Sequence, residues 1–420
     1  MKDQLSRVKS EAPARPAPRR LRIAWLGHKS GRVGGGIATY SNEIVHALRA
    51  RGHHVTYFHH LAPGQPELPE EVSLSSVSLG RTAIYSPPAA RRSLVEALGS
   101  GRFDAVHASL WFSSLDFALP RICREAGVPL VVTFHLAFGP GPSVWAGVSS
   151  ALYRLYASVL RESDRVIVFS KAQAELMVEM GVSPAATRVI ANGVDTAKFR
   201  PGPSDGRARL AAERYLIYLG RIDPEKNVGQ LIRAFLEVDP PAGTKLAVVG
   251  SGTERLSLQR RFPDPRVVFL GHVSDEAERI SLLRGADAFI LPSSVEGLSL
   301  AMLEAMSCGI ATVVTNTGSD GETVRGAGVV LELEELRAEL ACVIRLLLEL
   351  PWLCRRLGAE ARRRVERSYS LERNVDSLVE LYRALPIAHR PPTVTATTAS
   401  RDHVRPPTIR LAATVDPRRP

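Results

Sequence analysis

The feature that most constrains the fold is an alternation of short apolar runs with helix-length amphipathic segments, which occurs twice along the chain. In the first half the runs are LRIAWLG (21–27), HVTYF (54–58), FDAVHAS (103–109), LVVTFHL (130–136) and RVIVFS (165–170). In the second half they are RYLIYLG (214–220), KLAVVG (245–250), RVVFLG (266–271), AFILPSS (288–294) and ATVVTN (311–316). Such runs are typical of parallel strands joined by helical crossovers. The pattern predicts an α/β protein with two doubly wound, Rossmann-like domains.

The two series also predict the domain boundaries. We expect one domain over residues 21–200 and a second over 210–370, joined within FRPGPSDGRAR (199–209), where Pro, Gly and charged residues replace the periodic pattern. The segments 1–20 and 390–420 are rich in Pro, Ala, Thr and Arg and lack apolar periodicity, so we expect disordered basic tails.

The net charge of +11 is concentrated in these tails. Each tail carries six Lys or Arg residues against two acids, which leaves +3 for the rest of the chain. This distribution does not indicate nucleic-acid binding. It favours solvated tails, with weak attraction to an anionic membrane surface as the alternative.

Location and redox state follow from absences in the sequence. No run approaches the roughly 18 apolar residues of a membrane span, and the N-terminal segment lacks the apolar centre of a signal peptide. We expect a cytoplasmic protein, with peripheral contact at the inner face of the membrane as an addition. Four widely separated cysteines indicate neither a zinc site nor disulfides, and we expect buried thiols.

A glycine-rich segment, GHKSGRVGGGIATY (27–40), follows the first apolar run. It does not match the dinucleotide pattern G-x-G-x-x-G, because Thr39 stands at the third glycine position. The turn from Gly34 to Gly36 could still bring backbone N–H groups at a helix start close to an anion. The alternative is a tight turn before a helix, without a ligand.

Two glutamates eight residues apart form the strongest candidate site, in SSVEGLSLAMLEAMSCG (293–309). Glu296 lies at the mouth of an expected helix and Glu304 about one and a half turns inside it. The helix start between them suits phosphate, and the carboxylates suit hydroxyl-rich groups on either side, as in a nucleotide sugar. The alternative is a helix-capping Glu296 and a solvent-facing Glu304. The apolar neighbours of Glu304 disfavour that alternative, because an unpaired acid would be costly among them.

Two cations are expected at the same sheet edge. In YLGRIDPEKNVGQLI, Arg221 follows an apolar run and Lys226 precedes the next helix. Together they could bind a diphosphate and stabilise the charge that grows on it as a leaving group. Taken alone, each would be an ordinary solvated surface residue.

With these motifs in place, the chain resembles the GT-B glycosyltransferases, in particular the retaining family 4 type, from about Leu21 to Leu385. The resemblance rests on GGGIATYSNEIVHALRARGHHV, DAVHAS, TFHL, ANGVD, YLGRIDPEKN, VVGSG, FLGHVSDEAE and LPSSVEGLSLAMLEAMSCGIATVVTN, in the family's order. It implies two domains that face a central cleft. It also implies that a helix at 371–386 crosses back to the first domain.

The resemblance further implies roles for individual residues. Glu304 would bind the ribose and Glu296 the donor sugar, while the backbone near Val273 would contact the base. Arg221 and Lys226 would bind the diphosphate, with help from backbone groups of Gly35, Leu298 and Ser299. His135 matches the active-site histidine near the donor sugar, so the implied catalytic residues are His135, Arg221, Lys226 and Glu296. His107 matches a position at the cleft without a defined role.

Two departures from the family pattern affect the expected donor geometry. Asn227 stands where glycine is usual, and TNTGSDGETVRGAG (315–328) is an unusual form of the family's Gly-Gly loop. Arg221, Lys226, Glu296 and Glu304 match the family, which favours an active enzyme.

We therefore expect a retaining, hexosyltransferase-type enzyme that moves a sugar from a nucleoside-diphosphate sugar to an acceptor hydroxyl. The acceptor could be a glycan, a lipid-linked molecule or a small molecule. No two aspartates are separated by a single residue, so the D-x-D metal motif is absent, and we expect neither metal nor cofactor. The alternatives are a nucleotide-sugar epimerase on the same scaffold and a non-catalytic nucleotide-sugar-binding partner.

Overall fold

A computed structural model describes residues 19–28, 35–60, 70–79, 83–100, 103–110, 112–136 and 144–386. The tails predicted at 1–20 and 390–420 lie outside the described residues, apart from Arg19 and Arg20. None of the helices in the described part of the chain has the length and apolarity that a membrane crossing requires.

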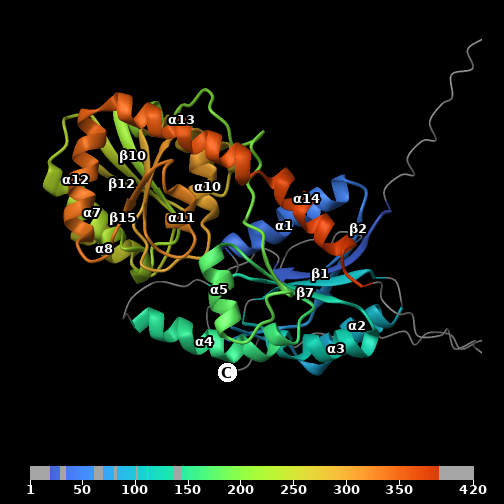
Figure 1. The fold of residues 1–420 in the computed structure, drawn as a ribbon. Coiled ribbons are helices and arrows are strands. Elements are labelled where there is room, and N and C mark those ends of the chain that lie inside the picture. The colour runs from blue at the N-terminus through green and yellow to red at the C-terminus, as the bar shows by residue number, and fades with distance from the viewer. Residues whose placement is uncertain are drawn as a thin grey trace, which may run out of the picture. The chain divides into compact units, whose positions relative to one another are not determined.

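The first half of the chain forms a parallel sheet (Figure 1). Its strands are, in spatial order, β3 (Glu71–Leu74), β2 (His54–His60), β1 (Arg22–His28), β6 (Ala105–Leu110), β7 (Leu130–Phe134), β8 (Arg165–Val168) and β9 (Thr187–Val189). A small antiparallel pair, β4 (Val77–Leu79) and β5 (Ala83–Tyr85), lies apart from it. The helices of this half are α1 (Gly35–Ala50), α2 (Pro88–Gly99), η1 (Asp116–Ala118), α3 (Leu119–Ala126), α4 (Val144–Arg161) and α5 (Lys171–Glu179).

The second half forms another parallel sheet. Its strands are, in spatial order, β12 (Val267–Gly271), β11 (Thr244–Val249), β10 (Arg214–Leu219), β13 (Ala288–Leu291), β14 (Ala311–Thr315) and β15 (Val329–Leu331). Its helices are α6 (Gly206–Leu210), η2 (Pro224–Lys226), α7 (Val228–Val238), α8 (Arg255–Arg261), α9 (Glu276–Gly285), α10 (Leu300–Ser307), α11 (Asp320–Val324), α12 (Leu336–Glu349) and α13 (Pro351–Ser368). In Figure 1, α7 and α12 lie side by side, as their contacts require.

The strand order reverses once in each sheet. The chain moves outward from β1 to β3 and then returns to β6 on the other side of β1. In the second sheet it moves outward from β10 to β12 and returns to β13. Loops on the two sides of such a reversal diverge, and ligands bind beyond the carboxyl ends of the strands there. The reversal at β10 and β13 positions the candidate site.

All ten apolar runs form strands of these sheets, which confirms the predicted fold class of two α/β domains with parallel sheets. The central strands are apolar on both faces, and every residue of β7 and β14 is buried. The sequence did not predict β3, β4, β5, β9 or β15. Each has only three or four residues, and most of these strands carry exposed or half-buried positions, so their apolar signal is weak.

The helix predicted to cross back to the first domain is α14 (Leu371–Arg383). Its residues Val375 and Leu378 belong to one apolar cluster with Ile23 and Trp25 of β1. Its last turn places the Tyr382 hydroxyl 2.5 Å from Nδ1 of His107, a buried residue of β6. The C-terminal helix is therefore part of the core of the first sheet.

The segment 199–209, predicted as the joint, is partly structured. Phe199 is fully buried in the core of the second sheet, and α6 begins at Gly206. The exact domain boundaries stay predictions.

Of the four cysteines, Cys342 contradicts the expectation of buried thiols, because it lies on the solvent-facing side of α12.

Candidate active site

The candidate site lies at the carboxyl ends of β10 and β13, where the order of the second sheet reverses. The loop after β10 contains Arg221 and leads into η2, and the loop after β13 contains Glu296 and leads into α10. The loops contact one another, since the Ser294 N–H donates to the Glu225 carbonyl oxygen at 2.8 Å. The structure therefore brings the two motifs together, as their places after adjacent parallel strands predict.

Lys226 and Glu296 form a buried ion pair. The Nζ of Lys226 donates to Oε1 of Glu296 at 2.6 Å and lies 3.4 Å from the Val295 carbonyl oxygen. The side chains are only 10% and 14% exposed. Sequence reasoning predicted both residues at this edge but did not predict that they pair with each other.

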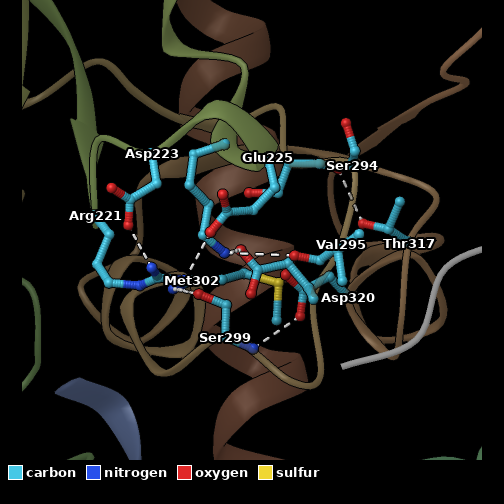
Figure 2. A network of polar contacts seen from close by, with 12 residues as sticks. Arg221, Asp223, Glu225, Ser294, Val295, Ser299, Met302, Thr317 and Asp320 are labelled. Carbon is cyan, nitrogen blue, oxygen red and sulfur yellow. Dashed lines mark hydrogen bonds and ion pairs between the residues drawn. The ribbon is translucent and has the colours of Figure 1, made fainter. Parts of the chain in front are cut away.

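Arg221 lies at the same edge but is more exposed, with 60% of its side chain accessible. Its guanidinium is paired with the carboxylates of Asp223 and Glu225, the latter at 2.8 Å (Figure 2). Asp223 is fixed in turn, because its Oδ1 accepts from the N–H and the hydroxyl of Thr253 at 2.8 and 2.9 Å. A diphosphate at this edge would compete with these carboxylates for Arg221.

Asn227, the first departure from the family pattern, adopts a left-handed conformation with φ +52°. Asparagine tolerates that region better than most residues, so the glycine usual here is replaceable. Its side-chain amide donates to the Pro292 carbonyl oxygen at 2.9 Å and to the Ser294 hydroxyl at 2.6 Å. The substitution thus ties the start of α7 to the loop after β13.

The N-terminus of α10 is occupied by a side chain that sequence reasoning missed. The Ser299 N–H, predicted to contact the donor, donates to Oδ1 of Asp320 at 2.8 Å (Figure 2). The Ser299 hydroxyl caps the helix by accepting from the Met302 N–H at 3.2 Å. The neighbouring Leu298 carbonyl oxygen accepts from the Asn192 amide at 3.1 Å. The signal in the sequence was the unusual segment from the end of β14, residues 315–328, which contains Asp320 at the start of α11.

Glu304 is almost fully buried, with 6% of the residue exposed. It faces Arg279 of α9, whose Nη2 donates to Oε1 at 3.4 Å and whose Nε lies 3.3 Å from Oε2. Burial raises the pKa of Glu304 to about 7, and Arg279 acts against that rise. The expectation that an acid among apolar neighbours needs a partner is met by Arg279, which no sequence motif indicated.

The predicted residues of the first half lie at the ends of its strands and helices. His135 follows β7, is buried, and packs edge-on against Tyr40 with ring centres 4.8 Å apart. Gly35 is the first residue of α1, with φ +36°, while Gly34 lies outside the described residues. Val273 follows β12 and is buried. Their predicted roles in donor binding stay predictions.

His107 is a buried residue whose ring is held by contacts within the first domain and with α14. Its ring stacks on Trp25 at 4.0 Å, its Nε2 lies 2.8 Å from the Thr133 hydroxyl, and its Nδ1 contacts Tyr382. Burial lowers the pKa of His107 to about 3, and His135 adds to the effect. A neutral ring that joins α14 to the first sheet accounts for the residue.

Within the described ranges, no three His, Cys, Asp or Glu side chains are grouped so that they could hold a metal ion. The polar groups at the candidate site are instead two cations and several carboxyls, beside a helix N-terminus whose Ser299 N–H already donates to Asp320. Such a set can bind a diphosphate flanked by hydroxyl groups.

Comparison with known proteins identifies the family. The model of Glycosyltransferase Family 4 matches residues 34–198, and that of Glycosyl transferases group 1 matches residues 207–364. A glycogen synthase from Mycobacterium tuberculosis is 33% identical over 308 residues, which cover 70% of this chain and 72% of the relative. The chain belongs to glycosyltransferase family 4. A D-inositol 3-phosphate glycosyltransferase from Geodermatophilus obscurus is 30% identical over 430 residues, covering 90% of this glycosyltransferase and 91% of the relative.

Solved structures show the same GT-B fold. Sucrose-phosphate synthase from Thermosynechococcus elongatus matches with a TM-score of 0.69 and 24% identity over 87% of this chain and 98% of the other. HepE from Anabaena, solved in complex with UDP-glucose, matches with a TM-score of 0.70 and 19% identity over 87% of this chain and 100% of the other. The glycosyltransferase is thus a GT-B enzyme with two Rossmann-like domains. This confirms the family and the fold that the sequence motifs implied.

Proposed function

We propose that this glycosyltransferase transfers a hexose from a nucleoside-diphosphate sugar to an acceptor hydroxyl, with retention of the anomeric configuration. The observation that carries the proposal is the buried Lys226–Glu296 pair at the reversal of the second sheet. It unites a cation suited to a diphosphate with a carboxylate suited to sugar hydroxyls at one point. The binding of UDP-glucose by HepE, a structural neighbour, supports a donor of this class.

The donor would be held along α10. Glu304, inside the helix, would accept hydrogen bonds from the ribose hydroxyls, and the backbone near Val273 would contact the base. Lys226 and Arg221 would contact the diphosphate, and Glu296 the sugar. His135 would lie near the sugar from the first domain. In this arrangement the diphosphate adjoins the two cations whose positive charge opposes the charge of the leaving group.

The reaction would proceed on one face of the sugar. The bond between the anomeric carbon and the phosphate oxygen breaks, and a bond to the acceptor oxygen forms on the same face. The acceptor's hydroxyl proton passes to the departing phosphate oxygen, so atoms and charge balance without an enzyme nucleophile. Arg221 and Lys226 stabilise the negative charge that increases on the diphosphate, and they do so more strongly in the transition state than in the ground state. We propose that they take the place of a metal ion.

A donor panel tests this proposal. Calorimetry with UDP-glucose, GDP-mannose and ADP-glucose should show binding of at least one donor. Glu304→Ala should weaken that binding without loss of the fold, whereas Glu349→Ala, at an exposed position on α12, should leave it unchanged. Proton NMR of the product should show the anomeric configuration of the donor.

Proton NMR of the reaction mixture, together with the calorimetry, also separates the alternatives. An epimerase would convert the sugar of the donor without any acceptor. A non-catalytic binding partner would bind the donor through Glu304 and turn over no acceptor. Donor binding that is unchanged in Glu304→Ala would contradict the proposed placement of the nucleotide. A cytoplasmic location stays a prediction.

A further inference from the structure

Asp320 is the first residue of α11 and is held tightly against the loop after β13. Gly318, two residues earlier, has φ +55°, and a Cβ there would lie 2.1 Å from the Glu296 carbonyl oxygen. The Ser319 N–H donates to the Gly297 carbonyl oxygen at 2.7 Å. Only a glycine allows this approach. The two loops therefore fix the Asp320 carboxyl at the start of α10.

The two oxygens of this carboxyl have different surroundings. Oδ1 accepts from the Ser299 N–H at 2.8 Å, whereas Oδ2 is buried and has no hydrogen-bond partner among the described residues. The residue is 1% exposed. A buried polar atom that no protein group satisfies is costly, so a proton, a water or a ligand atom must meet it.

The local charges favour a proton on Asp320. Lys226 carries a positive charge close to Asp320, but its ammonium group donates to Glu296 and not to Asp320. Arg221 is paired with two other carboxylates. Arg364 of α13 contacts the far end of α11, where it donates to backbone carbonyl oxygens. An ionised Asp320 would thus be a second buried anion beside Glu296, served by one lysine.

The direction of the pKa shift of Asp320 agrees with this excess of carboxyl groups over cations. Burial raises that pKa well above its ordinary value, and the charge of Glu296 raises it further. The Ser299 N–H and Lys226 act in the opposite direction. In the neutral acid, Oδ1 would be the carbonyl oxygen that accepts from Ser299, and Oδ2 would carry the proton.

A purely structural role as a cap of α10 would explain Oδ1 but not Oδ2. An anionic cap would be favourable at a helix start in water, but this one is buried beside another carboxylate. A diphosphate arriving at Lys226 would add negative charge to the same place. A neutral Asp320 removes that conflict and supplies a hydrogen-bond donor.

We propose that Asp320 is a donor-binding residue that acts as a neutral acid, with Oδ1 on the Ser299 N–H and Oδ2–H donating to an oxygen of the sugar-phosphate part of the donor. The inference rests on the proposed nucleotide-sugar donor. It differs from the sequence-based expectation in that a carboxyl O–H, and not the Ser299 N–H, meets the ligand.

Two substitutions separate the neutral acid from other roles. Asp320→Asn keeps an acceptor for the Ser299 N–H and places an amide N–H donor where the O–H was. The affinity of this variant for the nucleotide sugar that the wild type binds should therefore stay within about threefold of the wild-type value. Asp320→Leu keeps the branched shape but is larger, and it loses both the O–H donor and the acceptor for the Ser299 N–H, so affinity should fall about tenfold or more, as for a lost hydrogen bond to a charged group. Glu322→Gln, at an exposed position on α11, is the matched control and should bind like the wild type.

Two further readouts guard against misfolding and test the proton directly. The nucleoside monophosphate of the same donor lacks the sugar and the second phosphate, so Asp320→Leu should bind it as the wild type does. The infrared difference between wild type and Asp320→Asn at neutral pH should contain the C=O band of a protonated carboxyl.

The outcomes are decisive. A carboxylate band in place of the acid band, or a loss of affinity in Asp320→Asn equal to that in Asp320→Leu, overturns the inference. Unchanged donor affinity in Asp320→Leu also overturns it. A wild-type protein that binds no nucleotide sugar overturns the proposed function itself, and the inference with it.

Discussion

Replacement of Lys226 by methionine should lower the stability of the second domain strongly. The change removes the ammonium that lies 2.6 Å from Oε1 of Glu296 and leaves that carboxylate buried without its cation. Removing one partner of a buried ion pair costs about 3–5 kcal/mol. Because a tenth or more of each side chain is exposed, we expect the lower end, about 3 kcal/mol. At about 2–4 °C per kcal/mol, the melting temperature should fall by roughly 6–12 °C.

A double-mutant cycle measures the pair itself. The double variant Lys226→Met/Glu296→Gln removes both charges, so it should recover about 2 kcal/mol of the sum of the single losses. The matched control is Arg121→Met, which breaks an exposed pair with Glu125 at 2.7 Å. Exposed pairs contribute little, so that variant should change stability by less than about 1 kcal/mol. The measurement is scanning calorimetry at pH 7 of the wild type, Lys226→Met, Glu296→Gln, the double variant and the control Arg121→Met.

The same substitution should also affect catalysis. If Lys226 stabilises the leaving diphosphate, kcat should fall by roughly 10² or more, and the donor KM should change less. The reasoning is refuted if Lys226→Met melts like Arg121→Met, or if the double variant shows strictly additive losses. A wild-type kcat would separately contradict the assignment of Lys226 to the leaving group.

Four further results are expected. Burial raises the pKa of Glu304 to about 7, and its carboxylate is the form that would accept from ribose, so donor affinity should fall as pH drops below 7; Glu304→Gln should lower affinity and weaken this dependence in calorimetric titrations, with Glu43, whose pKa burial also raises to about 7, left to titrate. Tyr382→Phe should reduce the free energy of unfolding by about 1–3 kcal/mol, because Nδ1 of His107 loses its buried partner; a wild-type denaturation curve would exclude this role. EDTA should leave turnover unchanged, and activity lost to EDTA and restored by Mg²⁺ or Mn²⁺ would contradict the assignment of charge stabilisation to protein cations. Deletion of residues 1–18 and 392–420 should preserve the melting temperature and turnover of a soluble acceptor, and a large loss of melting temperature would show that a tail docks on the folded chain.

The central strands could be predicted because their apolar runs are long enough to exclude other structures. β10 and β13 are buried almost throughout, and the residues that follow them necessarily lie at one sheet edge. That reasoning placed Lys226 and Glu296 together without a structure. The short strands β9 and β15 could not be predicted, because three residues carry too little periodicity.

The pairings within the site could not be predicted from spacing. Arg279 approaches Glu304 from another helix, 25 residues earlier in the chain, and the register between α9 and α10 determines the contact. Asp320 reaches Ser299 only because Gly318 lets one loop lie on another. Both depend on tertiary packing, which a local pattern does not contain.

The return of α14 to the first sheet has a consequence for synthesis on the ribosome. The apolar cluster that contains Ile23 and Trp25 is completed by residues as late as Tyr382 and Leu385. At about 5–20 residues per second, roughly 20–70 s separate the translation of β1 from that of its last packing partner. During this interval the second domain can finish its own core, while part of the surface of the first stays open to water. A nascent chain should therefore need protection at its older half, and loss of residues 371–385, which are α14 and the two residues after it, would damage the domain that was made first.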